Sequence, residues 1–256
     1  MNLLIRGGGD IASGVAIRAY RAGFKVFITE LPQPLAVRRT VSFSEAIYEG
    51  KWTVEGVTAR RAESAGQIID IMNDRDLPVI IAPDIDDLLL DYQVLIDARL
   101  AKSNAHYALS SRPMVIGLGP GFFAGKNCHA VVETNRGHML GRVYWEGSAQ
   151  PDTATPEGDS RRVLRAPCNG TVTSQVKIGQ HVEPGQVVAY VANEPVISPL
   201  AGVIRGLIRP EVAINKGLKI GDVDPRDEPS HCNFVSDKAL AVGGGVLEAI
   251  LHYFPI

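Results

Sequence analysis

The residues whose types and spacing point most directly to chemistry lie at the start of the chain. A short apolar run at residues 3–5 leads into three glycines, and a small residue completes the spacing Gly-x-Gly-x-x-Ala. In such a turn the first glycine allows a tight bend, and the second lets the backbone approach a phosphate. The helix that follows would direct N–H groups toward the anion. We predict a nucleotide-type binding site formed by Gly7, Gly8, Gly9, Asp10, Ile11 and Ala12.

Glu30 ends a second apolar stretch at residues 25–29. It follows the glycines by about 20 residues, the distance at which an acidic residue binds ribose hydroxyls in dinucleotide sites. An acid at this position argues against a ligand with a 2′-phosphate. The alternative is that the glycines serve packing alone and bind nothing. Asp10 adds to the ambiguity, because it could repel a pyrophosphate or cap the helix.

Charged residues and glycines follow two further apolar runs, at residues 94–96 and 114–118. In open parallel sheets, ligands bind beyond the carboxyl ends of the strands. Glycines after a strand can also form a nest of N–H groups that holds an anion. The alternatives are a surface ion pair with a helix cap, and a plain structural turn. The additional candidates are Asp97, Arg99, Lys102, Gly119 and Gly121.

Two weaker sets of candidates remain open. Arg38 and Arg39 could clamp phosphates or could begin a solvated helix. His129 and Glu133 share one face of an expected strand, but a metal site needs a third ligand. We therefore prefer ordinary polar residues on a sheet face and predict no metal.

The composition excludes several classes of protein. The 256 residues are 45% hydrophobic and 21% charged with a net charge of −2, which gives no electrostatic footprint for nucleic acid or an acidic membrane. No apolar run has the ~20 residues that a membrane span needs, and the N-terminus is expected to be a strand rather than a signal peptide. Cys128, Cys168 and Cys232 form neither a disulfide framework nor a CxxC motif. A cytoplasmic location is the expectation.

Beyond a linker-like stretch at residues 148–160, the sequence repeats itself. Residues 167–172 return as 199–204, and Gly170 recurs as Gly202, 32 residues on. Each copy is expected to form two strands around a turn, too small to bury its own apolar face. The spacing resembles the biotinyl/lipoyl-type barrel-sandwich hybrid. The corresponding hairpin tip at residues 192–196 lacks lysine, so a swinging-arm carrier is not expected.

These patterns predict an α/β Rossmann-like domain over residues 1–150 and an all-β barrel-sandwich-hybrid domain over residues 160–224. A C-terminal segment over residues 225–256 would supply a helix that packs back on the first domain. The glycines at 243–245 would each cost a helix about 1 kcal/mol relative to alanine. We expect either a close backbone approach at that run or a loop.

Six motifs together resemble the YqeB-like family, described as accessory proteins of the selenium-dependent molybdenum hydroxylase system. The first domain is similar to the Rossmann domain of XdhC-type molybdenum cofactor chaperones. The resemblance covers nearly the whole chain, in what looks like the short form of the family. It implies a molybdenum hydroxylase apoenzyme as partner and supplies no catalytic residue. The motifs are residues 5–14, 29–43, 117–122, 132–137, 219–226 and 236–248.

The expected function is that of a maturation factor binding a nucleotide or molybdopterin-nucleotide cofactor. Alternatives are an NAD-linked oxidoreductase, with Lys102 or His129 as proton donor, and a non-catalytic assembly protein. Whether the chain is an enzyme or a homo-oligomer stays open, as does the choice between a dinucleotide and a molybdenum cofactor. If a cysteine carries sulfur or selenium, Cys128 is the first choice, because Lys126 nearby would lower its pKa. The alternative is that all three cysteines are ordinary small residues.

Overall fold

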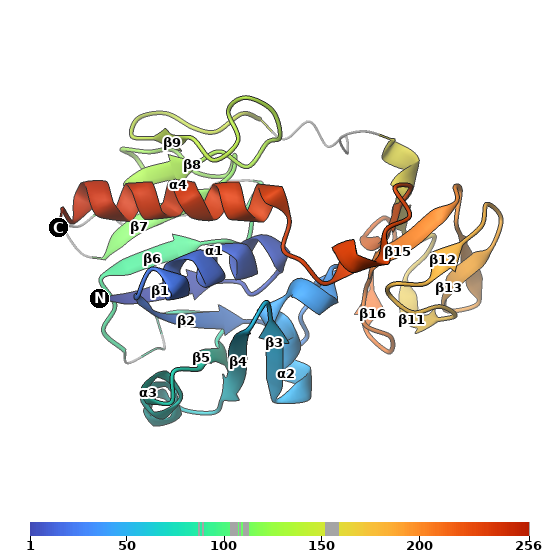
Figure 1. Ribbon diagram of the computed structural model, residues 1–256, viewed down its shortest axis with the longest axis horizontal. Coiled ribbons are helices and arrows are strands. Elements are labelled where there is room, and N and C mark those ends of the chain that lie inside the picture. The colour runs from blue at the N-terminus through green and yellow to red at the C-terminus, as the bar shows by residue number, and fades with distance from the viewer. Residues whose placement is uncertain are drawn as a thin grey trace. The chain divides into compact units, whose positions relative to one another are not determined.

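The computed structural model describes residues 1–86, 88, 90–102, 107, 109, 113–151 and 159–255. The chain divides into two compact units (Figure 1). The first contains Met1–Pro34, Phe43–Thr153 and Val235–Ile256, and the second contains Leu35–Ser42 and Ala154–Phe234. Within the described residues, no helix combines the length and the apolar character that crossing a membrane requires.

The first unit is built on a nine-stranded sheet in the order β3-β4-β5-β2-β1-β6-β7-β8-β9. Its middle strands are parallel, and the apolar runs predicted from the sequence form them. Both edges are antiparallel, because β3 pairs with β4 and β9 pairs with β8. The strands are β1 (Asn2–Arg6), β2 (Lys25–Glu30), β3 (Lys51–Val54), β4 (Val57–Ala62), β5 (Leu77–Ile81), β6 (Val94–Asp97), β7 (Met114–Leu118), β8 (Ala130–Val132) and β9 (Val143–Tyr144).

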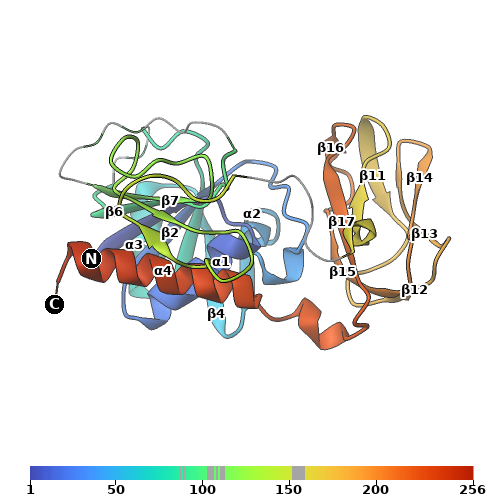
Figure 2. The same cartoon turned by 90° about the horizontal axis from the view of Figure 1, so that it is seen from above.

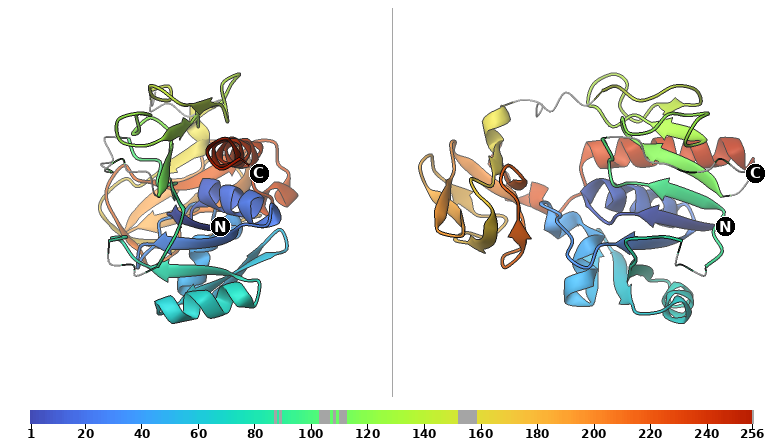
Figure 3. Two further views of the ribbon diagram at one scale, coloured as in Figure 1. Left: turned by 90° about the vertical axis from the view of Figure 1, so that its left-hand side faces the viewer. Right: turned by 180° about the vertical axis from the view of Figure 1, so that it is seen from behind.

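Helices cover the two faces of this sheet unequally. Helices α1 (Asp10–Arg21) and α4 (Asp237–Tyr253) lie side by side on one face, as Figures 1 and 2 show. On the other face, α3 (Ala65–Asn73) packs Ile68 against a row of core side chains that includes Leu4 and Phe27. The right panel of Figure 3 shows the central strands of this sheet side by side, seen from behind. Shorter helical segments are η1 (Arg39–Val41), η2 (Phe43–Glu45), α2 (Ala46–Glu49), η3 (Ser160–Arg162) and η4 (Pro229–Cys232).

Glycines allow α1 and α4 to pack closely. A Cβ atom placed on Gly14 would lie 2.5 Å from the Cβ of Ala239, and one placed on Gly243 would lie 2.9 Å from Cγ of Arg18. A Cβ on Gly245 would lie 2.2 Å from the carbonyl oxygen of Gly141. Helix α4 runs through the glycines without a break. The close backbone approach predicted for this run is therefore confirmed.

The second unit consists of two four-stranded antiparallel sheets around one apolar core. Strands of the two sequence repeats pair with each other, since β11 pairs with β16 and β12 pairs with β15. The segment 35–42 joins this unit, because the carbonyl of Val37 accepts a hydrogen bond from the amide of Leu207. The strands are β10 (Val163–Arg165), β11 (Gly170–Ser174), β12 (His181–Val182), β13 (Val187–Val191), β14 (Glu194–Ile197), β15 (Gly202–Leu207), β16 (Ala213–Ile214) and β17 (Lys219–Asp224).

The expected fold class, an α/β Rossmann-like domain plus a separate barrel-sandwich-hybrid domain and a C-terminal helix, is wrong. The described chain is mostly β: a large mixed sheet with antiparallel edges, two small sheets and the long helix α4. A doubly wound fold joins neighbouring parallel strands through a crossover helix. Here β2 and β5 are parallel neighbours, and the chain between them contains the antiparallel pair of β3 and β4. The strand–glycine–helix pattern holds for residues 2–30, and it does not predict how the rest of the sheet is connected.

Candidate functional site

The candidate site lies at the carboxyl ends of β1 and β6. From β1 the chain moves outward through β2 and β5, and then returns to place β6 on the other side of β1. At such a reversal the connecting loops leave in opposite directions and open a crevice between the two strand ends. Arg6 ends β1, and its register partner on β6 is Asp97. The predicted glycine turn begins one residue later.

Gly7 and Gly8 are both explained by the fold. Gly7 adopts a φ of +94°, which disfavours residues with a side chain, and its amide donates to the carbonyl of Thr29 at 2.8 Å. The amide of Gly8 donates to Oε2 of Glu30 at 2.6 Å, and its carbonyl accepts from the amide of Ser44 at 2.9 Å. A Cβ on Gly8 would lie only 3.0 Å from that Ser44 nitrogen. Backbone conformation and packing therefore account for these two glycines.

Gly9 is different, because nothing in the described structure requires a glycine there. It is the N-cap of α1 with an ordinary φ of −67°, and a Cβ placed on it would meet no atom within 4 Å. It also offers no side chain to cap the helix, although serine, threonine, asparagine and aspartate are favoured at this position. The first amides of a helix have no acceptor within the helix. The space beside Gly9 at the start of α1 is therefore open.

A buried carboxylate lies at the end of β6, beside Arg6 in the register of the sheet. Asp97 is fully buried and accepts hydrogen bonds from Nε of Arg99 at 3.0 Å and from the hydroxyl of Tyr107 at 2.7 Å. Arg6 donates to the same hydroxyl at 3.1 Å and to the carbonyl of Pro83 at 2.8 Å. Burial and the charge of Asp97 raise the pKa of Tyr107 to about 12. Tyr107 therefore stays protonated at neutral pH and acts as a donor.

Glu30 does not have the geometry expected of a residue reserved for ligand hydroxyls. Its Oε2 accepts from the amide of Gly8, and its Oε1 accepts from the amide of Leu31 at 2.7 Å. Burial raises the pKa of Glu30 above the usual value, while these two amides act in the opposite direction. Glu30 thus closes the glycine turn.

Some of the remaining predicted residues lie in the group around Asp97, and others are explained by local packing. The structure brings Asp97 and Arg99 together, and Lys102 is exposed. A Cβ on Gly119 would lie 2.9 Å from Oγ1 of Thr134, and one on Gly121 would lie 2.2 Å from the carbonyl oxygen of Ala101. Close packing therefore accounts for both glycines without a ligand.

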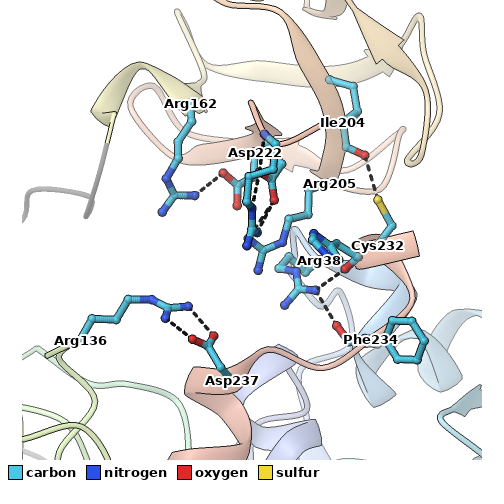
Figure 4. Close-up of polar contacts among 12 residues, drawn as sticks. Arg38, Arg136, Arg162, Ile204, Arg205, Asp222, Cys232, Phe234 and Asp237 are labelled. Carbon is cyan, nitrogen blue, oxygen red and sulfur yellow. Dashed lines mark hydrogen bonds and ion pairs between the residues drawn. The ribbon is translucent and has the colours of Figure 1, made fainter. Parts of the chain in front are cut away.

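Arg38 and Arg39 have structural partners in the second unit. Arg38 donates through Nη2 to the carbonyls of His231 and Phe234, and Arg39 donates through Nε to the carbonyl of Leu207. Figure 4 shows the Arg38 contacts near the ion pair of Arg162 with Asp222. These contacts attach the segment 35–42 to its unit. Both arginines are therefore explained by these contacts, without the phosphate clamp that the sequence suggested.

No group of three or more His, Cys, Asp or Glu side chains is placed to hold a metal ion among the described residues. His129 accepts from the amide of Val115 through Nδ1, and Glu133 accepts from the amides of Asn135 and Gln150. Burial raises the pKa of Cys128 to about 12. The expectation that a nearby cation activates this thiol is therefore wrong, because desolvation outweighs any such effect.

Thiol labelling of the folded protein is expected to detect Cys168 first. Cys168 is half-buried, whereas Cys128 and Cys232 are buried. At a pKa of about 12, Cys128 holds about a thousandfold less thiolate than an ordinary cysteine, and the thiolate is the reactive form. The rapid phase of reaction with a disulfide reagent at pH 8 should disappear in Cys168→Ser. A rapid phase that persists in that variant would contradict the assignment.

Sequence reasoning missed two members of the site. Arg6 could have been identified from the sequence, because a charged residue between an apolar strand and a glycine turn lies at the carboxyl end of that strand. Tyr107 gave no local signal, because it comes from a connection ten residues beyond Asp97. A shallow pocket of about 320 Å³ lies nearby, and the Pro83 carbonyl that accepts from Arg6 belongs to its lining. Its walls are Ala65, residues 80–84 and Leu88.

Comparison with known proteins gives one close sequence relative and several remote structural ones. No family model matches the chain. Over a compared length of 255 residues it is 47% identical to a protein of Escherichia coli (strain K12) called "Uncharacterized protein YqeB", and the match covers 97% of this chain. The match covers 47% of that protein, so the chain spans about half the length of the curated relative it matches.

The similar solved structures are an aspartoacylase family protein from Mesorhizobium loti and a succinylglutamate desuccinylase/aspartoacylase from Rhodobacter sphaeroides. The first is 12% identical with a TM-score of 0.30 and covers 87% of this chain and 84% of its own. The second is 13% identical with a TM-score of 0.29 and covers 87% and 85%. At these TM-scores the likeness carries no argument about fold or activity.

These findings overturn the identification as a selenium-dependent molybdenum hydroxylase accessory protein with an XdhC-like first domain. The sequence relative is named only as uncharacterized, so its name supplies no connection to selenium, to molybdenum or to XdhC-type chaperones. The expected function in molybdenum hydroxylase maturation is wrong with it. One physical reason is that several of the matched motifs are glycine turns, such as Gly119 and Gly121, that packing alone requires.

Proposed function

We propose that the first unit binds a phosphate-bearing small molecule, with the phosphate at the first turn of α1. The observation that carries the proposal is the open space at Gly9, the one glycine of the turn that neither packing nor backbone conformation explains. A side chain at this position would obstruct an anion approaching the helix start. The positive end of the helix dipole and its leading amides favour a bound anion.

The surroundings of the turn support a preorganised site. Gly8 is held on one side by Glu30 and on the other by Ser44, so the backbone at the start of α1 is fixed before any ligand arrives. Arg6 and Arg99 supply positive charge at the neighbouring strand ends. The glycine turn is therefore already ordered in the folded protein. Binding does not have to supply the free energy of ordering it, so this cost does not reduce the affinity.

The pocket beside Pro83 offers room for the uncharged part of such a ligand. It lies at the end of β5, which is two strands from β1 in the sheet. Two inter-strand spacings amount to about 10 Å. A phosphorylated compound of ordinary metabolite size can span that distance, with apolar atoms against Ile80 and Ile81.

Gly9→Val is expected to abolish binding of methyl phosphate while the protein stays folded. Valine tolerates the extended backbone of Gly9, and its side chain would occupy the space that the anion needs. The measurement is an NMR titration of the full chain, following the amide resonances of residues 9–12 in the wild type. Gly66→Val is the matched control, because Gly66 lies in the first turn of α3 with similarly open surroundings. Unchanged affinity in folded Gly9→Val protein would place the site elsewhere.

A further inference from the structure

A histidine at the edge of the second unit lies between two carboxylates. His181 begins β12, the edge strand of one small sheet. Its Nδ1 lies 2.7 Å from Oδ1 of Asp227, and its Nε2 lies 3.1 Å from Oε1 of Glu183. Glu183 directly follows β12, whereas Asp227 is 46 residues away, in the turn that follows β17. The imidazole ring therefore joins an edge strand to a turn from a distant part of the chain.

Only the doubly protonated ring can satisfy both of these contacts. A neutral imidazole has one N–H group, so its other nitrogen would place a lone pair against a carboxylate oxygen. The hydrogen bond with Asp227, followed by that with Glu183, raises the pKa of His181 above its usual value. The stabilisation is therefore complete below the usual pKa of histidine. It is lost as the pH rises through the raised pKa of the folded protein.

The other charged side chains close to this contact are directed elsewhere. Arg205 on β15 and Arg226 in the turn both bind Asp224. Glu228, the next residue after Asp227, accepts from the amide of Ser230. The residue that pairs with His181 on β15 is an uncharged valine. Among the described residues, the ring is thus faced by the two carboxylates, and the contact depends on its protonation.

The two copies of the internal repeat differ at this contact. At the 32-residue spacing of the repeat, His181 corresponds to Ala213. Asp227 corresponds in the same way to Pro195. Ala213 begins β16 as His181 begins β12, so the strand forms without a histidine. The contact occurs in the copy from which the chain leaves the second unit, because β17 is followed by η4 and then by Val235 of the first unit.

We infer that His181 is a pH-sensitive clasp, which in its doubly protonated form holds the turn at residues 224–228 against β12 and releases it when the ring loses a proton. This inference concerns the second unit and does not depend on the proposed anion site. Asp227 has a φ of +56°, a left-handed conformation that a residue with a side chain adopts at some energetic cost. Loss of the contact removes a restraint on that conformation. The connection from β17 to η4 therefore becomes more mobile in alkaline solution, while the sheets stay folded.

Hydrogen exchange of the full chain tests the clasp, measured by quenched-flow mass spectrometry at about pH 6 and about pH 9. After correction for the intrinsic effect of pH, residues 224–228 should lose about two- to fivefold of their protection at the higher pH, as for an exposed ion pair. In His181→Ala, which copies the other repeat, protection should be low at both pH values. Residues 192–196, the equivalent turn, should show no such change in the wild type.

Two further variants separate the clasp from the charge of the ring. Asp227→Asn and Glu183→Gln each remove one negative charge, so both should lower the pKa of His181, measured from its ring signals by NMR. Only Asp227→Asn should increase exchange in the turn at about pH 6, because Glu183 makes no contact between β12 and the turn. His252→Gln, which changes an exposed histidine of the first unit, should leave the turn unaffected.

Two results would overturn the inference. One is exchange at residues 224–228 that is the same at both pH values in the wild type. The other is a wild-type pH dependence that persists in His181→Ala. If His181→Ala does not fold, Asp227→Asn replaces it, and a turn that keeps the wild-type pH dependence in that variant contradicts the clasp.

Discussion

Replacement of Asp97 by asparagine is expected to lower the free energy of unfolding of the first unit by about 3 kcal/mol. Asp97 is fully buried and accepts hydrogen bonds from Arg99 and Tyr107. Asparagine carries no charge, so the guanidinium of Arg99 would lose its counter-ion. Part of that loss is offset by solvent, because the Arg99 side chain is 42% exposed. The measurement is urea unfolding followed by tryptophan fluorescence, since Trp52 and Trp145, the two tryptophans of the chain, both belong to the first unit.

The chain contains a matched control for this experiment. Asp159 accepts from Arg161 in the same two-residue spacing and with nearly the same distances, 3.0 Å from Nε and 2.6 Å from Nη2. This second pair lies at the surface. Because exposed ion pairs contribute little, Asp159→Asn should change stability far less than Asp97→Asn. Its unfolding is followed by far-UV circular dichroism, because Asp159 lies in the second unit and both tryptophans lie in the first. Equal effects of the two substitutions would show that burial of Asp97 is not what makes its carboxylate important.

Gly14→Ala is expected to destabilise the first unit by about 2–3 kcal/mol through overpacking. The added Cβ would lie 2.5 Å from Cβ of Ala239 and 2.9 Å from its backbone carbonyl carbon. Helices α1 and α4 would have to separate, and both lie on the same face of the sheet. In a helix, alanine is intrinsically better than glycine by about 1 kcal/mol, so a net loss can only come from the contact. Thermal unfolding followed by the same fluorescence would measure it.

Two further variants separate packing from helix propensity. Gly244 also lies in α4, but a Cβ placed on it meets nothing within 4 Å. Gly244→Ala should therefore stabilise the protein by about 1 kcal/mol. Ala239→Gly removes the nearest atom facing Gly14, so it should recover part of the stability in the double variant with Gly14→Ala. If Gly14→Ala stabilised the protein as much as Gly244→Ala, the close crossing of the two helices would be incorrect.

The local elements at the start of the chain and several strands of the sheet can be predicted from the amino-acid sequence. The strand, glycine turn, helix and second strand predicted over residues 2–30 are confirmed as β1, α1 and β2. The apolar runs at residues 94–96 and 114–118 are likewise strands, β6 and β7. Hydrophobic periodicity and the placement of glycines favour a local conformation through residues that are close in sequence. They therefore predict secondary structure without knowledge of the fold.

The role of each residue of the site depends on contacts that form only in the folded chain. The three adjacent glycines look alike in sequence, yet Gly8 is closed off by Ser44 and Glu30 while Gly9 faces open space. Tyr107 reaches Asp97 from a connection that carries no recognisable motif. The mixed edges of the sheet, and with them the failure of the expected fold class, follow from pairings between strands distant in the chain. Such contacts depend on burial and packing of the whole unit, and residue spacing does not encode them locally.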